Sequence, residues 1–235
     1  NYPLYFMTAL LTSATGNAEK VASYIREAKQ MNITILPPSI NHSAYPFLVE
    51  NGCIRISLAC IKNVGIVAIK EIFHERKKRK YTDLFDFCIR VSQKIINRRI
   101  MEQLIFSGAM DDFGVDRAIL LASLDVAIEH AELLSPTTDN QFDLFLNEEF
   151  SIKPKYIEVE NFKIDEKLKF EKEALGFYFS KHPAELYRDR LEQAGAIYIS
   201  EVNQTFDRKI SLGAMLISKR SIRTKKGEVM SFIVI

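Results

Sequence analysis

The 235-residue sequence lacks the features of an exported or membrane-spanning protein. No apolar run reaches the roughly 20 residues that cross a bilayer, and Asn1-Tyr2-Pro3 does not begin a charged segment followed by an apolar one. The three cysteines, Cys53, Cys60 and Cys88, are an odd number without C-x-x-C spacing. We therefore expect no membrane partner, no disulfide framework and no zinc site, and a location in the reducing cytoplasm.

Recognisable catalytic motifs are also missing. His42, His74, His130 and His182 have no metal-binding spacing, and neither a G-x-S-x-G nor a Walker phosphate-loop pattern occurs. Two-metal phosphoryl transfer needs carboxylates on rigid strands, whereas Asp111-Asp112 lies beside a helix end, where capping is the favoured role. We expect no catalytic residue and no cofactor in this chain.

The charged residues that are present are unevenly distributed. Hydrophobic residues make up 47% and charged residues 26%, as in ordinary globular proteins, and the net charge is only +2. From Lys62 to Lys80, however, seven Lys and Arg face two Glu, and from Ser135 to Lys167 acidic residues outnumber basic ones. This pattern favours a polyanion as the partner of the first stretch and a different partner for the second.

Hydrophobic periodicity predicts a mixed N-terminal segment, a helical middle and the start of a β-domain. The expected elements are a helix over 17–31 capped by Asn17, a hairpin with its turn at Asn51-Gly52, a helix from Asp116 to about 134, helices over 166–179 and 183–194, and strands over 209–218 and 228–235 joined by the turn 221–227.

The first candidate binding element is the turn Ile61–Gly65, which leads into a predicted helix over 66–79. A glycine-bearing turn at a helix N-terminus presents free backbone N–H groups and the positive end of the helix dipole, which suit a phosphate oxygen. The alternative is a plain turn between helices, in which Gly65 only relieves strain, and this turn alone favours the alternative modestly.

A second unit changes that balance. Lys94–Arg99 leads through a helix to Ser107-Gly108-Ala109, so that two glycine-containing units follow one another as in a tandem helix-hairpin-helix domain. Such domains grip the DNA backbone without reading bases. The candidate contacts with duplex DNA are Lys62, Asn63, Val64, Gly65, Lys70, Lys94, Arg98, Arg99, Ser107 and Gly108. The cluster Arg76–Lys80 either adds phosphate contacts or is a solvated helix end.

The peptide Gln141-Phe142-Asp143-Leu144-Phe145 is the second candidate site. It lies in a polar loop after a predicted helix, where bulky apolar side chains suit another protein's pocket better than their own core. It resembles the clamp-binding pentapeptide of bacterial replication proteins, with Gln141 as the polar anchor and Leu144-Phe145 as the apolar plug. Alternatively, Phe142, Leu144 and Phe145 fold back on the preceding helix.

The C-terminal region is the third candidate site. Its strand pattern resembles the opening of an OB-fold, which combines a basic groove with an aromatic stacking surface for single strands. Phe232 is either a stacking platform or a core residue. The candidate contacts with single-stranded DNA are Lys219, Arg220, Arg223, Lys225, Lys226 and Phe232.

Five stretches together resemble the DnaE-type alpha subunits of bacterial DNA polymerase III, the C-family replicative polymerases. They are Phe6–Leu11, Ile35–Asn41, Ile61–Gly65, Asp86–Cys88 and, most specifically, Phe170–Tyr178. The missing initiator Met and an end within a strand-like pattern agree with a piece of a longer polypeptide. One departure is Asn63, where a glycine is more typical of the hairpin turn.

The resemblance implies a mixed, mainly α fold. Residues 1–50 would end a fingers domain, 51–115 form the tandem helix-hairpin-helix, 116–195 carry the clamp-binding loop, and 196–235 begin a truncated OB-fold. It also implies that the catalytic aspartates, with their Mg²⁺, belong to a palm domain upstream.

The function expected of this chain is therefore to bind duplex DNA and the beta sliding clamp, beside other replisome subunits, during processive synthesis. The alternative is a standalone helix-hairpin-helix protein of repair or recombination.

Overall fold

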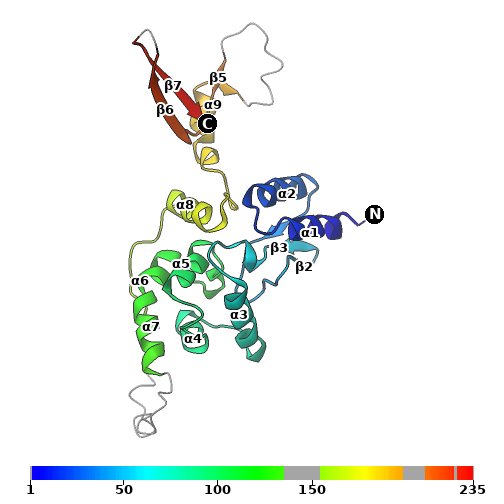
Figure 1. Ribbon diagram of the computed structural model, residues 1–235, viewed down its shortest axis with the longest axis vertical. Helices are drawn as coiled ribbons and strands as arrows, with labels where there is room; N and C mark the ends of the chain where they lie inside the picture. Colours follow the sequence, from blue (N-terminus) through cyan, green and yellow to red (C-terminus); the bar gives the residue numbers. More distant parts are fainter. Residues whose placement is uncertain (1, 135–153, 198–209, 225–226, 235) are drawn as a thin grey trace. The chain divides into compact units, whose positions relative to one another are not determined.

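The computed structural model describes residues 2–134, 154–197, 210–224 and 227–234. The chain divides into two compact units, the first ending at Phe179 and the second beginning at Ser180 (Figure 1). The predicted clamp-binding peptide, Gln141–Phe145, and the predicted contacts Lys225 and Lys226 lie outside the described residues. The domain boundaries expected near residues 50, 115 and 195 stay predictions.

Helices predominate in the first unit. Its elements are α1 (Pro3–Ser13), α2 (Ala18–Gln30), β1 (Ile35–Leu36), β2 (Leu48–Glu50), β3 (Cys53–Arg55), the 3-10 turn η1 (Leu58–Cys60), α3 (Ile66–Lys78), α4 (Leu84–Arg90), α5 (Arg98–Phe106), the 3-10 turn η2 (Asp111–Phe113), α6 (Arg117–Ala122), α7 (Leu124–Leu133) and α8 (Ile164–Leu175). None of the helices in the described part of the chain could cross a membrane.

The N-terminal elements form as local sequence signals predict. The Asn17 side chain accepts a 3.0 Å hydrogen bond from the Lys20 N–H and so caps α2. Asn51 and Gly52 both have positive φ and join β2 to β3 in an antiparallel hairpin. Strand β1 adds to β3 in parallel, which gives a three-stranded sheet in the order β1-β3-β2.

The core of the first unit joins helices that lie far apart in the sequence. Helix α4 packs against α7, and α5 against α8 (Figure 1). The rings of Phe106 on α5 and Phe170 on α8 stack with their centroids 4.4 Å apart. The Tyr156 hydroxyl accepts a 3.2 Å hydrogen bond from the Leu84 N–H, which ties the segment before α8 to the start of α4.

The helix expected from Asp116 is interrupted. Asp116 caps α6 as predicted, with a 2.9 Å hydrogen bond from the Ala118 N–H, but α6 ends at Ala122 and α7 begins at Leu124. At the junction, the Ser123 hydroxyl accepts a 2.8 Å hydrogen bond from the Ile157 N–H. The prediction of one uninterrupted helix was therefore wrong. The apolar pattern of the sequence continues through this junction, but Ser123 bonds to a distant segment.

The second unit contains a short helix and two small sheets. Its elements are the 3-10 helix η4 (Pro183–Tyr187), α9 (Arg188–Gln193), β4 (Ala196–Ile197), β5 (Ser211–Leu212), β6 (Ser218–Arg223) and β7 (Val229–Val234). Strands β4 and β5 pair in parallel, and β6 and β7 form an antiparallel hairpin. The helix expected over 183–194 therefore begins as a 3-10 helix.

The strand expected over 209–218 is wrong. Within this range Ser211–Leu212 form β5 and Ser218 begins β6, whereas residues 213–217 form no strand. Strand β6 extends to Arg223, into the expected turn. All residues of β6 and β7 are exposed, so alternation of side chains here reflects no buried face. The described residues form no closed barrel, and the predicted partial OB-fold is not confirmed.

Candidate nucleic-acid interface

The turn before α3 contains a residue in the left-handed backbone conformation. Asn63 adopts the left-handed conformation, with φ 64°, which asparagine tolerates better than most residues. Asparagine thus serves where glycine is more typical. Gly65 caps α3 with φ −73°, and a Cβ built there meets nothing within 4 Å. The backbone does not require glycine at this position, so its effect is to leave the α3 N-terminus uncovered.

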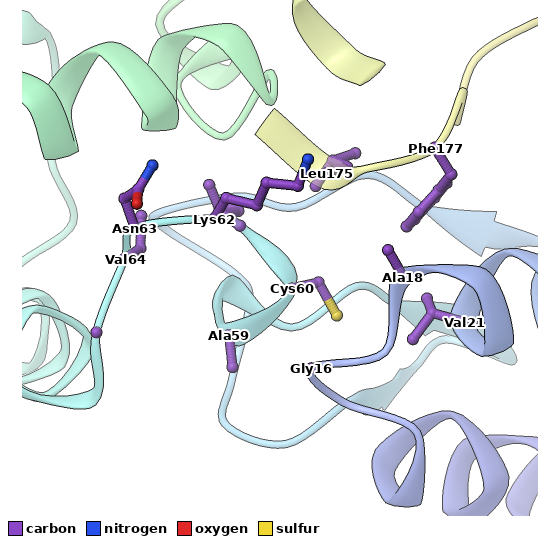
Figure 2. A pocket seen from close by; sticks show the side chains of 12 residues that line it. Gly16, Ala18, Val21, Ala59, Cys60, Lys62, Asn63, Val64, Leu175 and Phe177 are labelled. Atoms are coloured by element: carbon purple, nitrogen blue, oxygen red, sulfur yellow. The ribbon is translucent and has the colours of Figure 1, made fainter. Parts of the chain in front are cut away.

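The C-terminal end of α8 holds this turn in place. The Lys62 N–H donates a 2.8 Å hydrogen bond to the Ala174 carbonyl oxygen. Gly176 ends α8 with φ 86°, and a Cβ there would lie 3.3 Å from Cε of Lys62. Figure 2 shows the Lys62 side chain beside Leu175 at the edge of a cavity of about 430 Å³. Helix α8 is therefore part of the support of the first hairpin turn.

The second turn presents two arginines at a helix N-terminus. The Asn97 side chain caps α5 by accepting a 3.1 Å hydrogen bond from the Ile100 N–H. Arg98 and Arg99 follow as the first two residues of α5, and both are exposed. Lys94, also exposed, precedes them in the loop. The partial positive charge of the α5 N-terminus adds to these side-chain charges.

The two turns meet in one groove. A depression of about 700 Å³ in the first unit is bordered by residues of both turns, of α5 and of α8. We call it the two-turn groove, and its lining residues are Lys62, Asn63, Asn97, Arg98, Arg99, Glu102, Gln103, Phe106 and Glu173. The structure thus brings together predicted contacts that are separated in sequence, and adds carboxylates that sequence reasoning missed.

Six predicted contacts lie outside the lining of this groove: Val64, Gly65, Lys70, Lys94, Ser107 and Gly108. Val64 is buried, whereas Lys70 is exposed on α3. Ser107 and Gly108 lie at the opposite end of α5 from Asn97. Ser107 is buried, and its hydroxyl donates a 2.9 Å hydrogen bond to the Leu104 carbonyl oxygen. These positions favour a packing role for Val64, Ser107 and Gly108.

Gly108 makes room for a buried arginine. Its φ is 80°, and a Cβ there would lie 2.2 Å from Nη2 of Arg117. Arg117 binds Asp111 through two hydrogen bonds of 2.9 and 2.6 Å and lies 3.6 Å from the Glu171 carboxylate on α8. Although burial opposes it, these carboxylates raise the pKa of Arg117. The guanidinium therefore links α6, η2 and α8 as a permanent cation.

The basic cluster at the end of α3 is largely occupied within the fold. Arg76 donates hydrogen bonds of 2.9 and 2.7 Å to the carbonyl oxygens of Ile40 and Ser43. Arg79 forms an ion pair with Asp86, and Lys78 with Glu75 at 2.6 Å. These contacts favour the structural interpretation of Arg76, Lys78 and Arg79 over phosphate binding.

The predicted single-strand contacts are exposed on the β6–β7 hairpin. Phe232 is 56% exposed and faces Arg220 in the strand register. Lys219 and Arg223 project from the other face of β6. Phe232 is thus not a core residue within the described part of the second unit, which leaves the stacking role as a prediction.

The described residues hold no cluster of three or more His, Cys, Asp or Glu that could bind a metal ion. Burial raises the pKa of the Cys60 and Cys88 thiols to about 12, so both are protonated near neutral pH.

Two features therefore define the kind of protein: paired turns before helix N-termini, and a basic groove between them. A family model described as "Helix-hairpin-helix motif" matches residues 32–120. The chain contains this motif, as the sequence predicts.

The particular family follows from similarity to curated proteins. The chain is 53% identical, over 99% of its length, to the DNA polymerase III subunit alpha of Bacillus subtilis (strain 168). It is 37% identical over 99% of its length to that of Halalkalibacterium halodurans, and 34% identical over 97% to that of Vibrio cholerae. The resemblance to bacterial DNA polymerase III alpha subunits is confirmed. The chain spans 20 to 21% of the length of these relatives.

Sequence reasoning missed residues of α5, its N-cap and α8. Glu173 lines the two-turn groove, and Ala174 and Gly176 support Lys62. They lie within Phe170–Tyr178, the most specific stretch of the family resemblance, which was the available signal. They also lie beyond the matched motif at residues 32–120. The missed site residues are Asn97, Glu102, Gln103, Phe106 and Glu173.

Proposed function

We propose that the first unit binds the sugar–phosphate backbone of duplex DNA at the two-turn groove. The observation that carries the proposal is the convergence of Lys62 and Asn63 with the N-terminal end of α5 on one surface. The N-terminus of α5 and the cations Lys62, Arg98 and Arg99 suit the phosphates of a backbone. The internal pairing of the α3 cluster leaves this groove as the best-supported basic surface in the unit.

The proposed mode of binding is independent of base sequence. Backbone N–H groups and exposed lysine and arginine side chains recognise phosphate, which every nucleotide carries. Affinity is then expected to fall steeply with salt, because each neutralised phosphate releases counterions. A region of this kind would hold the duplex while the remainder of a polymerase acts on its end.

The experiment is fluorescence anisotropy of the 235-residue chain with two duplexes of unrelated sequence, titrated at several salt concentrations. We expect equal affinity for both duplexes, and weaker binding by Lys62→Ala and Arg99→Ala. Arg26→Ala is the matched control, because Arg26 is exposed on α2 outside the groove lining. Equal loss in all three variants, or a strong preference for one duplex, would contradict the proposal.

For the peptide Gln141–Phe145, the proposed partner is the beta sliding clamp. Its support is the sequence pattern together with the family, since a weak peptide contact beside a DNA grip raises effective concentration and gives processivity. Calorimetry with purified clamp tests it. The triple variant Gln141→Ala, Leu144→Ala, Phe145→Ala should lose binding, and no binding by the unaltered chain would refute the assignment.

The wider role that we propose is a part of a replicative DNA polymerase, located in the cytoplasm with other replisome subunits. Template-directed synthesis with Mg²⁺ would then belong to the parts of the relatives that this chain does not match. A standalone repair or recombination protein is not favoured, because the similar curated proteins are polymerase subunits.

Contact of the β6–β7 hairpin with single-stranded DNA remains a proposal, supported by the exposure of Arg220 and Phe232.

A further inference from the structure

Two adjacent arginines at the two-turn groove differ in their surroundings. Arg98 donates a 2.9 Å hydrogen bond from Nε to the Glu102 carboxylate, one turn along α5. It also forms an ion pair with Asp125 on α7. Arg99 makes no ion pair with any residue in the described ranges and is exposed at the second position of α5. Of these two neighbouring arginines, Arg98 is thus paired with carboxylates and Arg99 is available to a ligand.

The surroundings of Arg98 reduce its value as a phosphate contact. A phosphate that binds Arg98 would have to displace two carboxylates or lie beside them, and like charges repel at that distance. Glu102 itself borders the groove, and Glu173 borders it from α8. The groove therefore combines the cations with carboxylates that oppose a polyanion.

We propose that Arg98, Glu102 and Asp125 form an ionic latch between α5 and α7, and that Arg99 makes the phosphate contact at this helix N-terminus. This inference rests on the proposed function of the groove. Arg98 acts as a positioning residue, because its exposed ion pair with Asp125 joins the start of α5 to α7. Glu102 and Asp125 limit the affinity for DNA because they compensate the positive charge of Arg98.

The latch has a consequence that can be measured in both directions. Removing Arg99 should remove one phosphate contact, whereas releasing Arg98 from its carboxylates should add one. Each contact contributes a slope of about 0.9 to the dependence of log affinity on log salt concentration. The slope counts phosphate contacts, and a change that only disturbs folding does not shift it in this way.

The experiment measures duplex affinity of the 235-residue chain from low to high salt. For Arg99→Ala we expect about tenfold weaker binding and a slope smaller by about 0.9. For Arg98→Ala we expect a loss of less than about threefold and the wild-type slope. Thermal unfolding of each variant identifies those that fail to fold.

A variant that is expected to gain affinity tests the latch separately, because a destabilised protein would not bind DNA more tightly. The double variant Glu102→Gln, Asp125→Asn should bind about tenfold more tightly, with a slope larger by about 0.9. Adding Arg98→Ala to it should cancel that gain, because the released charge is then absent. A gain that persists in the triple variant would overturn the latch, since general loss of negative charge would then explain it.

The two proposals fail differently. Equal losses of affinity and slope for Arg98→Ala and Arg99→Ala would overturn the latch and leave the DNA-binding groove intact. No salt-dependent binding by the unaltered chain would overturn the proposed function, and the latch with it.

Discussion

The first unit and the β6–β7 hairpin differ in what they bury. A continuous apolar core runs through the first unit, from Met7 on α1 to Phe177 after α8. In the hairpin, apolar residues remain exposed, with Phe232 at 56% and Val229 at 70%. Backbone pairing is complete along both strands, yet no apolar face is covered. Regular secondary structure is therefore common to both regions, and only burial separates them.

The largest expected effect is on stability, and it distinguishes a phenylalanine of the first unit from one of the hairpin. Phe87 is fully buried on α4, so Phe87→Ala should lower the free energy of unfolding of the first unit by about 3–5 kcal/mol. Phe232→Ala should change the free energy of unfolding of the second unit by less than about 0.5 kcal/mol, because that ring lies on the surface. Urea denaturation followed by circular dichroism measures both. Similar effects would mean that the hairpin has a core of its own.

Two glycines of the first unit provide the next comparison. Gly108→Ala should destabilise by about 2–4 kcal/mol, because φ is 80° and the new Cβ would meet the Arg117 guanidinium. Gly65→Ala should leave stability within about 1 kcal/mol, since its backbone is unstrained and the space is open. DNA affinity should instead fall for Gly65→Ala, because a methyl group then covers the α3 N-terminus. Thermal unfolding and anisotropy separate the two outcomes.

The pH dependence of the first unit should include Asp116. Burial opposes ionisation, but hydrogen bonds from Lys167, at 2.6 Å, and from the backbone lower the pKa of Asp116. Its folded pKa thus lies below the unfolded value of about 3.9. The stabilisation is fully present above that value and is lost as pH falls through the folded pKa. Asp116→Asn should flatten stability in this acid window, measured by unfolding between pH 2 and 6. An unchanged profile would exclude the Lys167 contact.

The smallest effect is on thiol chemistry. Burial raises the pKa of the Cys60 and Cys88 thiols to about 12, so both should react slowly with an aromatic disulfide reagent. Cys88 is buried and should react only when the first unit opens. Cys53, on the half-buried strand β3, should react first. Absorbance at pH 8 would then show one fast phase that Cys53→Ser removes. Fast reaction of all three thiols would indicate that this unit is as open as the hairpin.

Prediction from sequence succeeded where the signal is local. Asn17 caps α2, Asn51-Gly52 forms the hairpin turn, and Asp116 begins α6, because each depends on hydrogen bonds or dihedral angles within a few residues. It failed at Ser123 and in the strand expected over 209–218. In the first case the partner is Ile157, far along the chain, and in the second the alternating pattern has no buried face to stabilise it.

The candidate site shows the same division. Sequence patterns located both turns, and Lys62, Asn63, Arg98 and Arg99 do line one groove. They could not separate these residues from Gly108, since a glycine that admits phosphate and a glycine that admits Arg117 look alike in sequence. The clamp-binding peptide Gln141–Phe145 stays a prediction.

By itself, the sequence determined the caps, the turns, the family and the absence of a recognisable catalytic motif. The tertiary structure alone decided which charges are available. Arg76 is bound to carbonyl oxygens, Arg117 to carboxylates and Arg98 to Glu102 and Asp125, whereas Arg99 forms no ion pair within the described ranges. The physical reason is that an arginine's neighbours in space, which folding brings from other elements, determine whether its charge is already compensated.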